Sequence, residues 1–236
     1  VMGPDCGTAI VNGIPLGFAN VVRRGNIGIV AASGTGLQQV SSLIDRYGAG
    51  VSQALGTGGH DLHAQVGGIT MLQGIHALAA DPDTAVIVLI SKPPAPEVIE
   101  SILNEASASG KPVVVDFIGA DPASLTGGAL YGAATLEDAA RQAVMLATDA
   151  TGSMDAEPGP DAALVNEVSA RLQPGQRYVR GLFSGGTFCL ETLLLLGQEL
   201  GPVWSNIPLK PEYRLHDVWK SQEHTAIDLG DDLFTQ

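Results

Sequence analysis

One local pattern occurs twice in this chain, and it constrains the fold more than any other feature of the sequence. An apolar strand runs into a turn of Ser, Gly and Thr, and the turn runs into an apolar helix, first over residues 27–44 and again over residues 178–196. A helix entered in this way points unpaired backbone N–H groups and the positive end of its dipole beyond the end of the strand. Each copy therefore predicts an anion site, at Ser33, Gly34, Thr35 and Gly36 in the first copy and at Ser184, Gly185, Gly186 and Thr187 in the second.

A simpler interpretation of the two turns stays open. Ser and Gly are common at helix N-termini without any ligand, so Ser33 and Ser184 can merely cap two core helices. The two roles are compatible, because a capped helix still presents free N–H groups. The two turns lie far apart in the sequence, so we expect them in separate lobes that converge on one phosphate or carboxylate.

The first 150 residues alternate strand and helix patterns, which predicts an α/β fold with a parallel sheet covered by helices on both faces. The expected strands are continuously apolar, as strands buried on both sides are, and the helices lie between them. We expect strands at 27–32, 51–55, 85–91 and 112–118, and helices at about 35–47, 65–80, 95–109 and 136–149.

The remaining sequence predicts a linker and a second, incomplete lobe. Residues 151–176 begin with a Gly-, Pro- and Asp-rich stretch, carry one short helical pattern and end at Pro174–Gly175. Residues 177–236 restart the strand–turn–helix pattern and continue with strands expected near 202–205 and at 225–229. The lobe is too short for a complete α/β domain, and we expect its remaining strands beyond Gln236.

Charge and composition exclude several classes of partner. The formal net charge is −13, from 12 Lys and Arg against 25 Asp and Glu, with no basic run. This argues against binding to nucleic acid or to an anionic membrane surface. No apolar stretch reaches the length of a membrane span and no signal region is evident, so we expect a cytoplasmic protein with Cys6 and Cys189 reduced.

Several motifs together resemble one known family. The segments GPDCG at 3–7, IGIVAASGTG at 27–36, GVSQALGTGGHDL at 50–62, DPDTAVIVLISKPPAP at 81–96 and GKPVVVDFIG at 110–119 resemble the CoA-ligase domain of the succinyl-CoA synthetase α subunit. The chain is still more similar to the FdrA family of acyl-CoA synthetase-related proteins, through RGLFSGGTFC at 180–189, PVWSNIPL at 202–209 and HTAIDLGDDLFT at 224–235. The resemblance implies a flavodoxin-like sheet of the succinyl-CoA synthetase type at 1–150 and part of a second, similar lobe at 177–236.

The resemblance also implies a function, with one departure. Succinyl-CoA synthetase holds a phosphohistidine between two helix N-termini, which the resemblance places at the Ser33 and Ser184 turns. The loop that carries this histidine in the synthetase is GADPASLTGGALYGAA here, at 119–134, and it contains no histidine. The resemblance implies that the nucleotide-type domain that binds CoA in the synthetase is missing too. We therefore expect transfer of an acyl or carbamoyl group to or from phosphate, as in an oxamate carbamoyltransferase subunit of purine catabolism, rather than ATP-driven ligation.

Further polar residues complete the expected site. His60 and Asp61 follow Gly58 and Gly59 at a strand end, where they can orient substrate or exchange a proton. Asn206 is the matching polar candidate in the second lobe. Asp231 and Asp232, with Asp228, are candidates for Mg²⁺, although a solvated acidic turn is the favoured explanation.

We expect an enzyme whose partner is a small anion, namely acyl or carbamoyl phosphate, phosphate or a carboxylate. CoA and Mg²⁺ are candidate cofactors, and the chain is expected in a homo-oligomer or a hetero-oligomer. Two alternatives stay open, an ATP-dependent acyl-CoA synthetase and a non-catalytic subunit for ligand binding or assembly.

Overall fold

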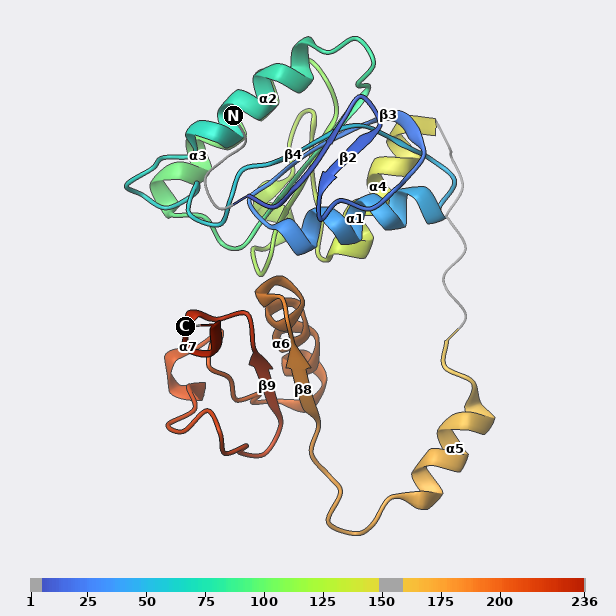
Figure 1. Cartoon of the computed structure of the whole chain (residues 1–236), viewed down its shortest axis with the longest axis vertical. Helices are drawn as coiled ribbons and strands as arrows, with labels where there is room; N and C mark the ends of the chain where they lie inside the picture. Colours follow the sequence, from blue (N-terminus) through green and yellow to red (C-terminus); the bar gives the residue numbers. More distant parts are fainter. Residues whose placement is uncertain (1–5, 149–158, 236) are drawn as a thin grey trace. The chain divides into compact units, whose positions relative to one another are not determined.

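The computed structural model describes residues 6–148 and 159–235 and divides the chain into two compact units, Val1–Thr151 and Gly152–Gln236 (Figure 1). Part of the predicted linker, at 151–158, lies outside the described residues, as do residues 3–5 of the first family motif. None of the helices in the described ranges has the length and the apolar character that a membrane crossing needs.

The first unit is built on one seven-stranded sheet whose order is β2-β1-β4-β3-β5-β6-β7. Five neighbouring strands, from β4 to β7, are parallel. Counted from β3, their spatial order is second, first, third, fourth, fifth, which is the flavodoxin-like order. The predicted α/β fold with a parallel sheet is confirmed. The strands are β1 Thr8–Val11, β2 Ile14–Gly17, β3 Arg24–Ala31, β4 Val51–Gly56, β5 Val86–Ser91, β6 Val113–Phe117 and β7 Leu130–Gly132.

Four helices cover the two faces of this sheet. Helices α1 (Gly34–Arg46) and α4 (Leu136–Thr148) pack together on one face, and α2 (Ile69–Ala80) and α3 (Pro96–Ala108) pack together on the other. The helix expected at 65–80 begins only at Ile69, because Gly67 and Gly68 adopt positive φ angles of 76° and 75° that a right-handed helix does not allow.

The core under α2 and α3 explains why the strands read as unbroken apolar runs. Val30, Leu89 and Val115 lie on three neighbouring strands, face the same side and are fully buried. The residues between them along each strand are buried on the opposite side by α1 and α4. With apolar contacts on both faces, the buried stretches of these strands have no solvent-facing positions for polar residues.

The hairpin of β1 and β2 was not predicted. Asn12 and Gly13, with φ angles of 51° and 78°, form a two-residue turn of the kind that joins antiparallel strands. Strand β1 pairs antiparallel with β4, so the hairpin extends the sheet at one edge. Val11 and Ile14 close the turn, which leaves the next pair, Ile10 and Pro15, without mutual backbone hydrogen bonds. The nitrogen of Pro15 therefore faces the free edge of the sheet.

The interval at 119–134, expected as one long loop, contains regular structure. A 3₁₀ helix, η1, spans Pro122–Leu125, and β7 adds a short parallel strand beside β6. Gly132 permits the close approach of the two segments, because a Cβ at this residue would lie 2.1 Å from the Pro122 carbonyl oxygen.

The second unit is smaller and is built around two parallel strands, β8 (Arg180–Phe183) and β9 (Thr225–Asp228). Helix α6 (Gly186–Leu200) packs on them through Cys189 and Leu193. The strand expected near 202–205 is wrong, since this segment makes only isolated bridges, at Trp204 and Ser205. The short helical pattern of the linker forms α5 (Ala162–Arg171), and two single-turn elements complete the unit, η2 (Pro211–Tyr213) and α7 (Asp232–Thr235).

Candidate functional site

The order of the sheet identifies where a ligand is expected in the first unit. Strand β3 lies between β4 and β5, and the connections that leave β3 and β4 run over opposite faces of the sheet. In open α/β sheets, ligands bind outside the carboxyl ends of the strands at such a point of reversal. Here these ends carry the turn at Ser33 after β3 and the segment Ser91–Lys92–Pro93 after β5.

Ser33 shapes the turn and caps α1. Its side-chain hydroxyl accepts a hydrogen bond of 2.9 Å from the backbone N–H of Gly36, as an N-cap residue does. Gly36 has to be glycine, because a Cβ there would lie 2.8 Å from the Ser33 Oγ and 2.9 Å from the Ile90 Cγ2. The first turn of α1 contains no acidic side chain, so the positive end of the helix dipole keeps no internal counter-charge.

A cavity of about 190 Å³ includes Ala32, the residue before the cap, but none of the turn residues from Ser33 to Gly36. Gly59 and His63 from the loop after β4 and Ser91 and Lys92 from the end of β5 also line it. Lys92 brings a flexible ammonium group to the rim, since its side chain is solvent-exposed. His63 and Lys92 are not among the predicted site residues, because neither stands out from ordinary surface residues before the loops are placed in space.

The loop after β4 contributes Gly58 and Gly59, of which Gly58 has a φ angle of 90° that favours glycine. His60 and His63 are exposed, and their rings meet edge to face with centroids 5.0 Å apart. Asp61 is buried, and its two oxygens accept hydrogen bonds from the backbone N–H groups of Thr70 and Met71 at the start of α2. Asp61 thus has a structural role, and proton exchange by His60 or Asp61 stays a prediction.

The second turn differs from the first in its cap. Gly185, in an extended conformation, is the N-cap of α6 and makes no side-chain capping bond, so Ser184 is not the cap residue. Thr187, in the first turn of the helix, is buried. This turn belongs to the second unit and the Ser33 turn to the first, and their convergence on one ligand stays a prediction.

Asn206 and the acidic residues of the second unit serve its packing. The Asn206 side chain donates to the backbone carbonyl of Asp228 at 3.0 Å and accepts from the Asp228 N–H at 2.9 Å. The Asp228 carboxylate accepts from the N–H of Gly230. Within residues 6–148 and 159–235, no three His, Cys, Asp or Glu side chains gather in a way that could hold a metal ion. We therefore propose no magnesium site at Asp231 and Asp232.

The sequence is similar to known proteins over these regions. Residues 22–119 match the family model described as the CoA-binding domain. Over 235 of its 236 residues, the chain is 50% identical to the Escherichia coli protein named "Uncharacterized protein YahF", of which it covers 45%. It is 33% identical over 95 residues to the Aquifex aeolicus succinate–CoA ligase [ADP-forming] subunit alpha, covering 39% of this chain and 30% of that protein.

A third relative is named as a subunit of a CoA ligase for a different acid. The subunit SauD of the ADP-forming sulfoacetate–CoA ligase of Bilophila wadsworthia is 32% identical over 111 residues, which cover 46% of this chain and 36% of that subunit. The chain spans less than half of the length of each of these three relatives. The family model that matches residues 22–119 is described as a CoA-binding domain. The resemblance had implied a different assignment, with a CoA-ligase domain at 1–150 and no CoA-binding domain in the chain.

Proposed function

We propose that this protein is acyl-CoA ligase-like and that its first unit binds the phosphate of an acyl or carbamoyl phosphate at the Ser33 turn. One observation carries the proposal. Ala32, the residue before the N-cap of α1, lines a cavity that Lys92 also lines, and the first turn of α1 has no acidic side chain, in a chain whose net charge is −13. Such a protein has to hold an anion locally, and backbone N–H groups do so without adding net charge.

The proposed chemistry is transfer of an acyl group between phosphate and a second acceptor. In the direction away from phosphate, a nucleophile adds to the acyl carbon and gives up its proton, the carbon–oxygen bond to phosphate breaks, and phosphate leaves with the electron pair and takes up that proton. The N–H groups of the α1 N-terminus and the Lys92 ammonium stabilise the charge that grows on the leaving phosphate. Orientation of the two reactants next to each other supplies a further part of the rate enhancement.

The comparisons support one acceptor of the acyl group. The match to the CoA-binding domain family and the similarity to two CoA ligase subunits support a thiol of CoA as the acceptor. The missing histidine in the 119–134 interval favours a direct transfer without a phosphorylated protein. The finer proposal is carbamoyl transfer between phosphate and an amide nitrogen, as an oxamate carbamoyltransferase subunit would perform in an oligomer with partner subunits.

Substitution of Thr35 tests the site without damaging the helix. Thr35 lies in the first turn of α1, where an acidic side chain favours the helix dipole and repels a bound anion. We expect Thr35→Glu to keep or raise the unfolding midpoint while it weakens binding of inorganic phosphate and carbamoyl phosphate by roughly tenfold or more. Thr35→Gln is the neutral control and should bind both within about twofold of the unmodified protein. Equal phosphate affinity for all three proteins would remove the α1 N-terminus from the site.

Three further experiments separate the alternatives. Incubation of the full-length protein with ATP, CoA and a carboxylic acid should leave no phosphate on the protein, whereas a phosphohistidine would support the ATP-dependent synthetase. Large side chains at both Ser33 and Ser184 should weaken carbamoyl phosphate binding more than either alone. Phosphate binding without turnover in the presence of all partner subunits would favour a non-catalytic subunit.

A further inference from the structure

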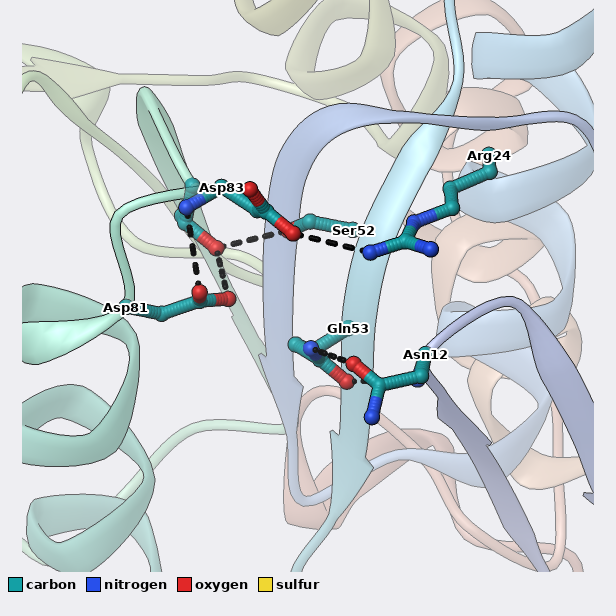
Figure 2. A network of polar contacts seen from close by, with 7 residues as sticks. Asn12, Arg24, Ser52, Gln53, Asp81 and Asp83 are labelled. Atoms are coloured by element: carbon teal, nitrogen blue, oxygen red, sulfur yellow. Dashed lines mark hydrogen bonds and ion pairs between the residues drawn. The ribbon is translucent and has the colours of Figure 1, made fainter.

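The polar side chains drawn in Figure 2 bond to one another and stabilise the sheet of the first unit. Figure 2 shows Asn12, at the tip of the β1–β2 hairpin, facing Gln53 on β4. The backbone N–H of Asn12 donates to the Gln53 Oε1 at 2.8 Å, and the Gln53 Nε2 donates to the Asn12 Oδ1 at 2.9 Å. The Arg24 guanidinium pairs with the Asp83 carboxylate at 2.8 Å. The second unit, by contrast, exposes two apolar surfaces.

The first of these surfaces is an apolar stripe along α5. Its residues recur at the spacing of one helix face, and each is between 45% and 56% exposed: Leu164, Val165, Val168 and, just after the helix, Leu172. Every residue from 159 to 180 is exposed to solvent. A short helix in water gains most of its stability when its apolar face packs on another element. The stripe therefore predicts a partner surface for α5.

The second surface is the open face of the sheet over β8. Phe183 and Ala226 face α6, whereas Leu182 of β8 and its pairing partner Ile227 of β9 face the opposite side. On that side Leu182 is 72% exposed and Trp219 is 79% exposed, and both line a hollow of about 330 Å³. Parallel strands are normally covered by helices on both faces, so this surface has the character of a helix-binding site. We call it the β8 face, which consists of Leu182, Trp219, Ile227, Leu229 and Phe234.

The charges around the two surfaces are opposite in sign. Helix α5 and its N-cap carry two carboxylates, Asp161 and Glu167, against one guanidinium, Arg171. Of the described residues that line the hollow of the β8 face, Arg180 alone is charged. Packing of α5 on the β8 face therefore brings a net negative helix to a positive rim, which favours this pairing over contact between two α5 helices.

The helix that covers the β8 face comes from outside the same copy. Because every residue of α5 is exposed, α5 does not lie on the sheet that follows it in the chain. The connection between α5 and β8 is held by a turn, in which the N–H of Gln176 donates to the Gln173 carbonyl at 2.9 Å. At the end of the connection, the N–H of Val179 donates to the His224 Nδ1 at 3.2 Å. A second copy of the chain supplies a free α5 without any change in this connection.

We propose that two copies of this chain exchange their α5 helices, so that the stripe of each α5 packs on the β8 face of the other copy. An exchange of this kind has two-fold symmetry. One pair of copies therefore covers both stripes and both β8 faces and leaves no open contact for a third copy. The proposal concerns the second unit and does not depend on anion binding in the first.

Self-association of the full chain tests the proposal. Size-exclusion chromatography with light scattering should show a dimer that dissociates on dilution. Val168→Asp in the stripe and Leu182→Asp on the β8 face should each weaken association at least about tenfold, because each buries a carboxylate among apolar side chains. Ala170→Asp, on the opposite side of α5, and Leu195→Asp, at an exposed position of α6, are the matched controls. Both controls should associate within about twofold of the unmodified chain.

A mixture of the two variants distinguishes an exchange from other dimers. The Val168→Asp copy keeps an intact β8 face, and the Leu182→Asp copy keeps an intact α5, so together they form one of the two contacts. An equimolar mixture should therefore associate roughly fivefold or more tightly than either variant alone. A misfolded variant could not restore association, so this result also shows that both variants are folded.

Tryptophan fluorescence measures the same contact in the unmodified chain. Trp219 is exposed in one copy and covered in the exchanged dimer, whereas the indole nitrogen of Trp204 is buried within one copy. Dilution should therefore increase quenching by acrylamide in the unmodified chain. It should leave the quenching of Val168→Asp, measured over the same concentrations, unchanged.

Each of the following results would overturn the exchange. Association that only Val168→Asp weakens would assign the stripe to a second α5, and association that only Leu182→Asp weakens would assign the β8 face to a second β8 face. A monomer whose Trp219 is shielded at every concentration would place α5 on its own copy. A monomer with exposed Trp219, or a dimer that neither variant weakens, would remove both surfaces from self-association.

Discussion

The carboxylate of Asp61 accepts a hydrogen bond of 2.8 Å from the backbone N–H of Met71, ten residues further along the chain. The second carboxylate oxygen accepts from the N–H of Thr70 at 2.9 Å. The residue at the N-cap of α2, Gly68, has no side chain for this purpose. Asp61 therefore caps the N-terminus of α2 from the other end of the loop that joins β4 to α2. Its two hydrogen bonds fix the Gly58–Gly59 end of this loop to α2.

Replacement of Asp61 should destabilise the first unit. Asp61→Ala leaves two N–H groups at the start of α2 without their acceptor, and we expect a loss of about 1–2 kcal/mol in the free energy of unfolding. Urea unfolding followed by circular dichroism measures the change. Asp121→Ala is a control, since Asp121 caps only the exposed 3₁₀ helix through Ala123, and it should cost less. A stability change at Asp61 no larger than at Asp121 would contradict the assigned role.

Two glycines inside helices should respond to alanine in opposite directions. A Cβ at Gly74 of α2 would lie 2.7 Å from the Val30 Cγ1, so Gly74→Ala should destabilise the protein by about 1–3 kcal/mol through overpacking. Gly197 of α6 has open space around its Cβ direction, and Gly197→Ala should stabilise α6 by roughly 0.5–1 kcal/mol. Thermal unfolding of both variants checks the signs, and a stabilising Gly74→Ala would show that α2 is not packed closely on β3.

Acid should weaken the contact between α4 and the end of α1. Hydrogen bonds from Arg141 and from the Tyr47 hydroxyl lower the pKa of Glu137 below its ordinary value of 4.5. A carboxyl whose folded-state pKa is lowered contributes stability above its unfolded pKa and loses it as the pH falls through the folded value. Glu137 is half exposed, so we expect less than about 1 kcal/mol.

Unfolding midpoints of the unmodified protein and of Glu137→Gln, compared from pH 6 down to the acid range, measure this contribution. The difference between them should be present at pH 6 and shrink below about pH 4.5. A difference that stays constant with pH would show that the charge of Glu137 does not matter for this contact.

Lys92 should contribute to anion affinity in a salt-dependent way. Lys92→Ala removes an exposed ammonium group from the rim of the cavity at Ala32, and phosphate binding should weaken about two- to fivefold at low ionic strength. At high salt the difference should largely disappear, because mobile ions screen an exposed charge. Isothermal titration calorimetry at two salt concentrations measures both values. Lys210→Ala, in the second unit, is the control for loss of one positive charge.

Most of the parallel sheet could be predicted from the sequence. The predicted strands that became β3 and β5 are apolar, β-branched runs of the kind that strands buried on both faces show, whereas β4 includes Ser52 and Gln53 and β6 includes Asp116. The hairpin was missed, although Asn12–Gly13 between two short apolar segments is a strong signal for a two-residue turn. Strand β7 has only three residues and lies in a glycine-rich interval. Its extended conformation depends on pairing with β6 and not on the strand propensity of its own residues.

The candidate site could be predicted only in part, because it is assembled from loops. The Ser33 turn was predicted, since a cap and a glycine-rich first turn are visible in the local sequence. Lys92 and His63 are separated by almost thirty residues, and only the placement of two loops on one sheet edge brings them to one cavity. Asp61 was predicted as a functional residue, whereas its hydrogen bonds to α2 depend on a loop conformation that the sequence pattern does not show.

The position of Pro15 affects how readily this protein aggregates through strand pairing at high concentration. Hydrogen bonding along a free strand is a common route to fibrous aggregates, and any incoming polypeptide needs donors as well as acceptors to pair with. At Pro15, one of the residues of β2 whose nitrogen faces outward, there is no hydrogen to donate. A single proline at such an edge position can therefore reduce aggregation through strand pairing. It does so without removing any of the backbone hydrogen bonds between β1 and β2.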